Sequence, residues 1–253
     1  MIDTSTIFVI VGTFMIAGTV KGVIGLGLPI VSLAILTLAI DLPSAMVLLL
    51  VPAIVTNVWQ AIIGGNIRII FRRIWPFLLM ATITVWIGAI ALSRVRLSLL
   101  SALLGVLLVA YSTISISGFR FTVEARHEVW VGILMGAVNG VLTGMTGSSV
   151  VPGVMFLQAL NLSRDTLIQA MGMLFAVSTL SLALALQQNN YLTIEHGTLS
   201  LGALIPAIIG MIFGQRIRKR LSEQIFRKVF FISLLALGIY IIVNKLGAMN
   251  LMT

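Results

Sequence analysis

Long apolar runs separated by short polar stretches occupy almost the whole chain. They form about ten segments, near residues 5–20, 23–40, 44–64, 74–92, 97–117, 129–145, 147–160, 166–187, 197–214 and 226–244. A helix needs about 20 apolar residues to cross ~30 Å of hydrocarbon, and most of these runs approach that length. The pattern predicts an all-helical (all-α) polytopic membrane protein. The four runs beside two Gly-rich stretches are shorter, and we expect broken or re-entrant helices there.

The two Gly-rich stretches each end at a proline. The first reads KGVIGLGLP at residues 21–29, and the second reads NGVLTGMTGSSVVP at residues 139–152. Glycine allows a ligand to approach the backbone closely, and a helix that begins after such a break directs free N–H groups and its positive dipole end toward it. In a membrane chain, paired breaks in corresponding places of two halves indicate a transporter's binding site. The motifs therefore predict an anion site built from both breaks.

Basic residues are distributed unevenly among the loops. The loops after odd-numbered segments hold twelve of them, namely Arg68, Arg72, Arg73, Arg120, Arg126, Arg164, Arg216, Arg218, Lys219, Arg220, Arg227 and Lys228. The even-numbered loops and the termini hold three, Arg94, Arg96 and Lys245, and Lys21 is set aside because it lies in the first motif. The positive-inside rule then places the odd loops in the cytoplasm and both termini in the periplasm.

The two halves of the chain follow the same order. Each has a broken motif, a span that begins after a polar loop, a span that contains proline and a final span. Because each half contains about five segments, an odd number, the copies must face opposite ways across the bilayer. The order predicts two inverted repeats within one membrane domain, residues 1–122 and 123–253.

The candidate substrate-binding residues are the motif residues and the amides of neighbouring spans. Lys21 supplies a positive charge, and hydroxyl and amide side chains supply hydrogen-bond donors. The full set is Lys21, Gly22, Gly25, Gly27, Pro29, Asn57, Gln60, Asn139, Thr143, Gly144, Thr146, Gly147, Ser148, Ser149, Pro152 and Gln169.

Several of these residues have a structural alternative. Glycines that recur every four residues, as at Gly132 and Gly136, are typical of closely packed membrane helices. Lys21 has the alternative of extending to the membrane interface. The amides of Asn57 and Gln60 either line the pathway or bond to a neighbouring helix.

Taken together, the first motif, the NVWQ run at residues 57–60, and the second motif with the QAMG run at residues 169–172 resemble the sulfite exporter TauE/SafE family of membrane permeases. The resemblance covers almost the whole chain. It implies a bacterial inner-membrane carrier of small anions, often sulfur-containing ones such as sulfite, sulfoacetate or other sulfonates. The chain departs from the expected glycine pair at Ser148 and Ser149, where we expect a less permissive backbone.

Composition excludes several other classes. Only 9% of residues are charged, against about 25% in soluble domains, and the net charge of +9 lies in short loops, so no nucleic-acid partner is expected. The chain has no cysteine, and its two histidines lie in different loops without metal-ligand spacing. We expect no enzyme activity, no cofactor and no metal.

The expected partners are a small anionic substrate and the lipid bilayer. All seven acidic residues lie in loops or at span ends, so no proton relay is predicted within the membrane. A coupling proton or cation, the direction of transport and the oligomeric state are left open. A carrier of small carboxylates and a non-transporting membrane scaffold or assembly factor are the alternative functions.

Overall fold

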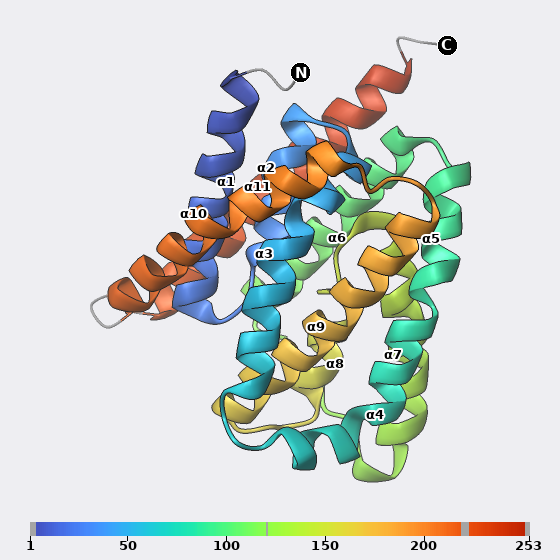
Figure 1. The fold of residues 1–253 in the computed structure, drawn as a ribbon. Helices are drawn as coiled ribbons and strands as arrows, with labels where there is room; N and C mark the ends of the chain where they lie inside the picture. The colour runs from blue at the N-terminus through green and yellow to red at the C-terminus, as the bar shows by residue number, and fades with distance from the viewer. Residues whose placement is uncertain (1–3, 120, 219–222, 251–253) are drawn as a thin grey trace. The chain divides into compact units, whose positions relative to one another are not determined.

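A computed structural model describes residues 4–119, 121–218 and 223–250 (Figure 1). These residues form helices and contain no strand. The helices are α1 (Thr4–Ile24), α2 (Leu28–Ala39), α3 (Leu42–Ile62), α4 (Ile67–Ile83), α5 (Val85–Arg94), α6 (Leu97–Ser117), the 3-10 helix η1 (Ala125–His127), α7 (Glu128–Thr146), α8 (Gly153–Ala159), α9 (Arg164–Gln188), α10 (Ile194–Arg218) and α11 (Glu223–Asn250). The expected all-helical class is confirmed.

Eight stretches within the described residues are long and apolar enough to cross a membrane. They are Ser5–Ile24, Leu42–Ile62, Ile67–Arg94, Leu97–Ser117, Ala125–Thr146, Arg164–Gln188, Ile194–Arg218 and Gln224–Gly247. The helices before the two breaks, α1 and α7, are therefore longer than the half-helices that the sequence suggested. Only α2, with 12 residues, and α8, with 7, are short.

Two boundaries differ from the sequence prediction. The run 147–160 is not one segment, because residues 147–152 are non-helical and only Gly153–Ala159 forms helix. The helix that was expected near residue 74 begins at Ile67, so Arg68, Arg72 and Arg73 lie in its first turns and not in a loop. Arginine is a good helix former, and a charge ends an apolar run without ending a helix.

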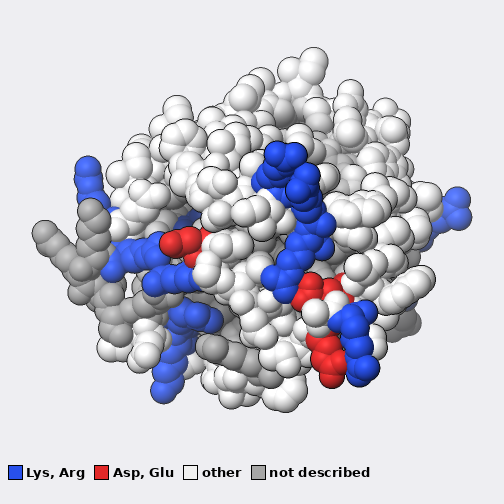
Figure 2. All heavy atoms as spheres, turned by 90° about the horizontal axis from the view of Figure 1, so that it is seen from below, with Lys and Arg blue, Asp and Glu red and all other residues white. Residues whose placement is uncertain are grey.

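Other charged residues also lie in helices. Arg216 and Arg218 close α10, and Figure 2 shows the Lys and Arg side chains that are exposed on the face seen from below. Glu128, Asp165 and Glu195 lie in first turns, where a negative charge is favoured by the helix dipole. Arg120, Lys219 and Arg220, which were counted for topology, lie outside the described residues.

The chain divides into two compact units that interleave along the sequence. Unit 1 contains α1, α2, α3 up to Pro52, α6, α10 and α11. Unit 2 contains the rest of α3, α4, α5, α7, α8 and α9. Each unit thus contains helices from both predicted repeats. The compact units therefore do not coincide with the repeats, and the repeat boundaries remain a prediction.

Within unit 1, two helix pairs pack closely through glycine. A Cβ at Gly18 or Gly22 of α1 would meet backbone carbonyl oxygens of α10, and one at Gly105 of α6 would lie 2.8 Å from the Gly238 carbonyl oxygen of α11. The rings of Tyr111 in α6 and Phe231 in α11, with centroids 5.3 Å apart, extend the contact between these two helices. Small residues allow this approach, because without a side chain two helix backbones can touch.

Within unit 2, α7 packs in the same manner against α4 and α5. A Cβ at Gly136 would meet the Phe77 carbonyl oxygen of α4, and one at Gly132 would lie 3.1 Å from the ring of Phe156 in α8. The Phe77 and Phe156 rings are 4.7 Å apart and fill the space beside these glycines. The packing role that the sequence indicated for Gly132 and Gly136 is confirmed.

The outward faces of the long helices are strongly apolar. Phe8 of α1, Ile205 of α10 and Val243 of α11 are each about two-thirds or more exposed, at 73%, 65% and 66%. Soluble proteins rarely expose contiguous apolar patches of more than a few hundred Å². Together with the eight candidate spans, these faces identify an integral membrane protein.

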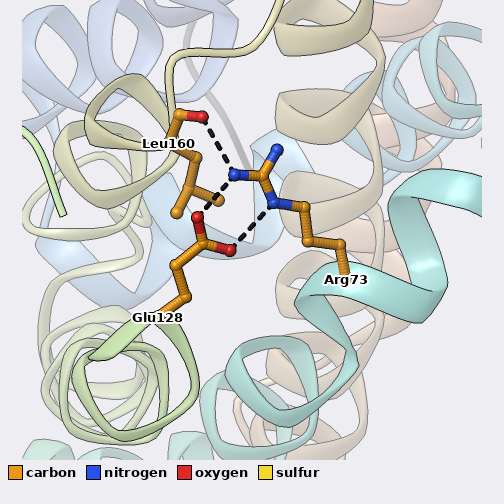
Figure 3. A network of polar contacts seen from close by, with 3 residues as sticks. All are labelled: Arg73, Glu128 and Leu160. Atoms are coloured by element: carbon orange, nitrogen blue, oxygen red, sulfur yellow. Dashed lines mark hydrogen bonds and ion pairs between the residues drawn. The ribbon is translucent and has the colours of Figure 1, made fainter. Parts of the chain in front are cut away.

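An ion pair joins three elements of unit 2 (Figure 3). Arg73 of α4 binds Glu128 of α7 through two parallel bonds, Nη2 to Oε1 at 2.5 Å and Nε to Oε2 at 2.9 Å. The same Nη2 donates to the Leu160 carbonyl oxygen at the end of α8, 3.1 Å away. The neighbouring Ala159 carbonyl accepts from the Val123 N–H at 3.1 Å. The end of α8 is therefore held from two sides.

Replacing Arg73 by methionine is expected to lower the free energy of unfolding by about 1 kcal/mol, because a bidentate but partly exposed pair and one carbonyl bond are lost. Thermal or denaturant unfolding of the purified protein measures this. The control is Arg68→Met, since Arg68 is exposed and has no ion-pair partner among the described residues. Equal stabilities of the two variants would contradict a role for the Arg73 network.

Candidate functional site

The first break separates α1 from α2. The N–H of Gly25 donates to the Lys21 carbonyl oxygen at 2.8 Å, and Gly25 has a φ of 77°, which reverses the chain at the end of α1. Gly27 precedes α2 with a φ of 113°, and Pro29 occupies its first turn. No side chain caps α2. Its first N–H groups are therefore candidate anion donors, as the motif predicted.

Lys21 lies in the last turn of α1 and is buried, with 5% of its surface exposed. Lys21 is therefore not an exposed side chain. A lysine that extends to the membrane interface would be exposed. Gly22 beside it contacts the α10 backbone at Met211. The Lys21 side chain is thus held within unit 1 next to the first break.

The second break repeats the backbone geometry of the first. Gly147 follows α7 with the same φ of 77°, and its N–H donates to the Thr143 carbonyl oxygen at 2.7 Å. Each break thus begins with a left-handed glycine bonded to the carbonyl four residues earlier, a common end of helices. The two motifs that sequence order paired are alike in conformation.

Ser148 and Ser149 stand where a glycine pair was expected, and the structure accommodates them. In the described residues, positive φ outside glycine occurs at Asn161 and Asn190 and not at either serine. The two serines thus adopt φ angles that are ordinary for their residue type, and the less permissive backbone stays a prediction. Both serines are buried, at 1% and 6% exposed, beside Pro152 at the start of α8.

The polar side chains of α7 bond both to the backbone of α7 and to the start of α8 after the break. Asn139 Oδ1 accepts from the Gly153 N–H at 3.0 Å. The Thr143 hydroxyl donates to the Asn139 carbonyl oxygen at 2.7 Å, and the Thr146 hydroxyl donates to the Leu142 carbonyl oxygen at 2.7 Å. Since each hydroxyl has one proton, these two threonines act toward a ligand as acceptors in this conformation.

Gln60 and Gln169 bond to each other's helix. Gln60 Nε2 of α3 donates to the Ile168 carbonyl oxygen of α9 at 2.7 Å, and Gln169 Nε2 of α9 donates to the Ala61 carbonyl oxygen of α3 at 2.9 Å. Gln169 Oε1 also accepts from the Asn66 N–H at 3.1 Å. The alternative of bonding to a neighbouring helix, considered for Gln60, thus describes its bond, and Gln169 makes a bond of the same kind. Asn57, one turn earlier on α3, is fully buried.

Replacing Gln169 by leucine is expected to reduce the free energy of unfolding by about 1–3 kcal/mol, because the Ala61 carbonyl and the Asn66 N–H would lose their buried partner. Thermal unfolding in detergent checks this. Gln187→Leu is the matched control, since Gln187 is exposed on the same helix and bonds through no side-chain atom in the described residues. A Gln169→Leu protein as stable as the control would show that these bonds contribute little.

Gly144 packs against α5. A Cβ on this residue would meet the Val85 carbonyl oxygen and, at 2.6 Å, the Ala89 nitrogen. The structure therefore gives Gly144 a clear packing role, as it does Gly22, while their contact with a substrate remains a prediction.

The candidate residues fall into two sets. Unit 1 holds Lys21, Gly22, Gly25, Gly27 and Pro29, and unit 2 holds the other eleven. Within unit 2, hydrogen bonds join Asn139, Thr143 and Thr146 to the second break, whereas Gln60 and Gln169 belong to the contact of α3 with α9. Within the described ranges, no group of three or more His, Asp or Glu residues is placed to hold a metal ion.

Sequence reasoning missed two residues of this region. Gly153 directly follows the proline at which the motif was taken to end, and its position after Pro152 was the available signal. Arg73 was counted only as a topological charge. Its partner Glu128 lies 55 residues away, and no spacing rule connects such a pair.

One comparison with known proteins gave a match. The family model described as Sulfite exporter TauE/SafE matches residues 10–241, nearly the whole chain. No curated protein and no solved structure matches.

Proposed function

Because the chain belongs to the sulfite exporter TauE/SafE family and is thereby a membrane transport protein for sulfur-containing anions, we propose that it is a secondary transporter of a sulfur oxyanion or organosulfonate, such as sulfite or sulfoacetate. It works by alternating access in the bacterial inner membrane. The observation that carries the proposal is the pair of breaks with equal backbone geometry, one of which has a buried lysine beside it.

Each break, taken by itself, offers groups that bind an anion. At the first, Lys21 provides charge, and the uncapped start of α2 after Gly27 provides N–H donors. At the second, donors come from the hydroxyls of Ser148 and Ser149, and Gly147 leaves the backbone accessible. Asn57 is the further polar group of this site, since a fully buried amide in a span is a functional candidate.

Helix pairing supports two inverted repeats, residues 1–122 and 123–253. Each first helix packs on the fourth element of the other repeat, α1 on α10 and α7 on α4 with α5. The glycine-to-carbonyl contacts have the same spacing in both pairs, namely Gly18 to Ala207 and Gly22 to Met211 in unit 1, and Gly140 to Ala81 and Gly144 to Val85 in unit 2. A four-residue spacing is general for closely packed membrane helices, so the support comes from its occurrence in helices that hold corresponding places in the two repeats.

The reverse contacts follow the same register. A Cβ at Gly214 of α10 would meet the Thr19 carbonyl oxygen, and one at Gly88 of α5 would meet the Val141 carbonyl oxygen. Thr19 and Val141 each directly follow a glycine of the first set. We take α1, α2, α3, α4 with α5, and α6 to correspond to α7, α8, α9, α10 and α11.

The proposal also includes the membrane topology and the driving force for transport. Both termini are periplasmic, in accordance with the loop charges. An inside-negative potential favours export of an anion by about 2.3 kcal/mol per charge per 100 mV, so export does not require a carboxylate within the membrane. Transport is driven by the potential or linked to a proton.

Thermal unfolding in detergent with a panel of anions tests the substrate class. We expect a selective rise in the melting temperature with one of sulfite, thiosulfate, sulfoacetate, taurine or isethionate, since a ligand that binds the native state stabilises it. Sulfate and simple carboxylates complete the panel. A response to carboxylates alone would indicate a carboxylate carrier, and no response to any anion would favour the scaffold alternative.

A further inference from the structure

The side-chain amide of Asn139 has a defined orientation. Asn139 is fully buried in α7, and one of its side-chain atoms lies 3.0 Å from the Gly153 N–H. Because that backbone group is a donor, the atom facing it must be the acceptor Oδ1. The other atom is then Nδ2, and it points away from this bond with two N–H donors.

No described residue accepts a hydrogen bond from Asn139 Nδ2. A buried donor without a partner costs about 1–3 kcal/mol, and folded proteins rarely retain one without a reason. Two other donors near it are already used, since the Gly153 N–H binds Asn139 itself and the Thr143 hydroxyl binds the Asn139 carbonyl. The amide is thus a remaining donor beside the second break.

Three helices of unit 2 hold this amide in place. A Cβ on Gly153 of α8 would lie 2.5 Å from Asn139 Oδ1 and 2.8 Å from Leu174 Cδ2 of α9. A side chain at position 153 would therefore clash with both Asn139 and Leu174. A donor that is fixed before a ligand arrives loses little entropy on binding it.

We propose that Asn139 Nδ2 donates a hydrogen bond to an oxygen of the transported anion and so determines affinity for it. This inference rests on the function proposed above and identifies one atom of that site. Ionised sulfur oxyanions and sulfonates present acceptor oxygens, which a fixed amide donor in a region of low dielectric binds strongly. Asn139 has a second task, since its Oδ1 holds the first N–H of α8.

The two tasks are separable by substitution. In Asn139→Asp, a carboxylate oxygen still accepts from the Gly153 N–H, but the Nδ2 donor is replaced by a negatively charged acceptor. In Asn139→Ala both are removed, without a buried charge. Asn244→Asp is the matched control for added charge, because Asn244 is exposed on α11.

The experiment measures the melting temperature of each full-length variant against sulfite and sulfoacetate concentration. We expect Asn139→Asp and Asn139→Ala to require at least about tenfold more anion than the parent for the same shift, the loss of about 1.4 kcal/mol of binding. Asn244→Asp is expected to respond as the parent does. Where Asn139→Asp does not yield folded protein, the alanine variant decides, each variant being compared with its own anion-free melting temperature.

Two failures are distinguishable. If the parent responds to an anion and both Asn139 variants respond equally well, the assignment of Nδ2 is wrong while the proposed function stands. If the parent responds to no anion of the panel, the proposed function fails and the assignment fails with it.

Discussion

The Gly144→Ala variant is expected to lose about 3 kcal/mol of stability or to fail to accumulate as folded protein. The added Cβ would meet the Val85 carbonyl oxygen and the Ala89 nitrogen, both backbone atoms that cannot rotate aside. Overpacking typically costs 1–3 kcal/mol, and the value rises when backbone must move. Melting temperature and yield from detergent extraction measure the effect.

Gly202→Ala of α10 is the control for this change. No atom lies within 4 Å of a Cβ at Gly202, so only the helix propensity changes, which favours alanine by about 0.5–1 kcal/mol. A Gly144→Ala protein as stable as Gly202→Ala would show that α7 and α5 are not in the close contact described.

The second large effect is expected for Lys21→Ala in transport. We expect the apparent affinity for the anion to fall at least about tenfold, since a charge-assisted contact contributes about 1.5–3 kcal/mol. The alternative is that Lys21 only stabilises the end of α1, where a positive charge complements the helix dipole. That role predicts a lower melting temperature without any change in affinity.

Initial rates of anion flux in proteoliposomes, measured over a range of anion concentrations, separate the two roles. Lys228→Ala is the control, because Lys228 is exposed on α11 and belongs to no part of the proposed site. Parent-like affinity in Lys21→Ala would remove Lys21 from the site and leave the second break as the remaining candidate.

Much of the fold follows from one-dimensional patterns. Runs of about 20 apolar residues predict spans because hydrocarbon thickness sets helix length, and Gly-rich motifs predict breaks because helices end at left-handed glycines such as Gly25 and Gly147. The same rule misses the early start of α4. An apolar run shows where a helix enters the hydrocarbon, whereas the backbone hydrogen bonds of α4 already begin at Ile67.

The site was less predictable, because its side chains bond across helices. Gln169 is a polar residue in an apolar span, which fits a pathway as well as a helix contact. Only its bonds to Ala61 and Asn66, more than 100 residues away, reveal the contact. Asn139, in contrast, stays a ligand candidate. Its place in the motif suggested a ligand contact but gave no reason to distinguish its two amide atoms. That distinction depends on Gly153, which the break brings back against α7.

The central claim, that this chain moves a sulfur-containing anion, is tested most directly by flux across vesicles that contain only the purified protein. Sulfite or sulfoacetate is loaded inside, and a potassium diffusion potential or a pH gradient is imposed. We expect protein-dependent efflux that accelerates when the loaded compartment is negative or when the proton gradient changes. Efflux equal to that of protein-free vesicles, or indifferent to both gradients, would contradict it.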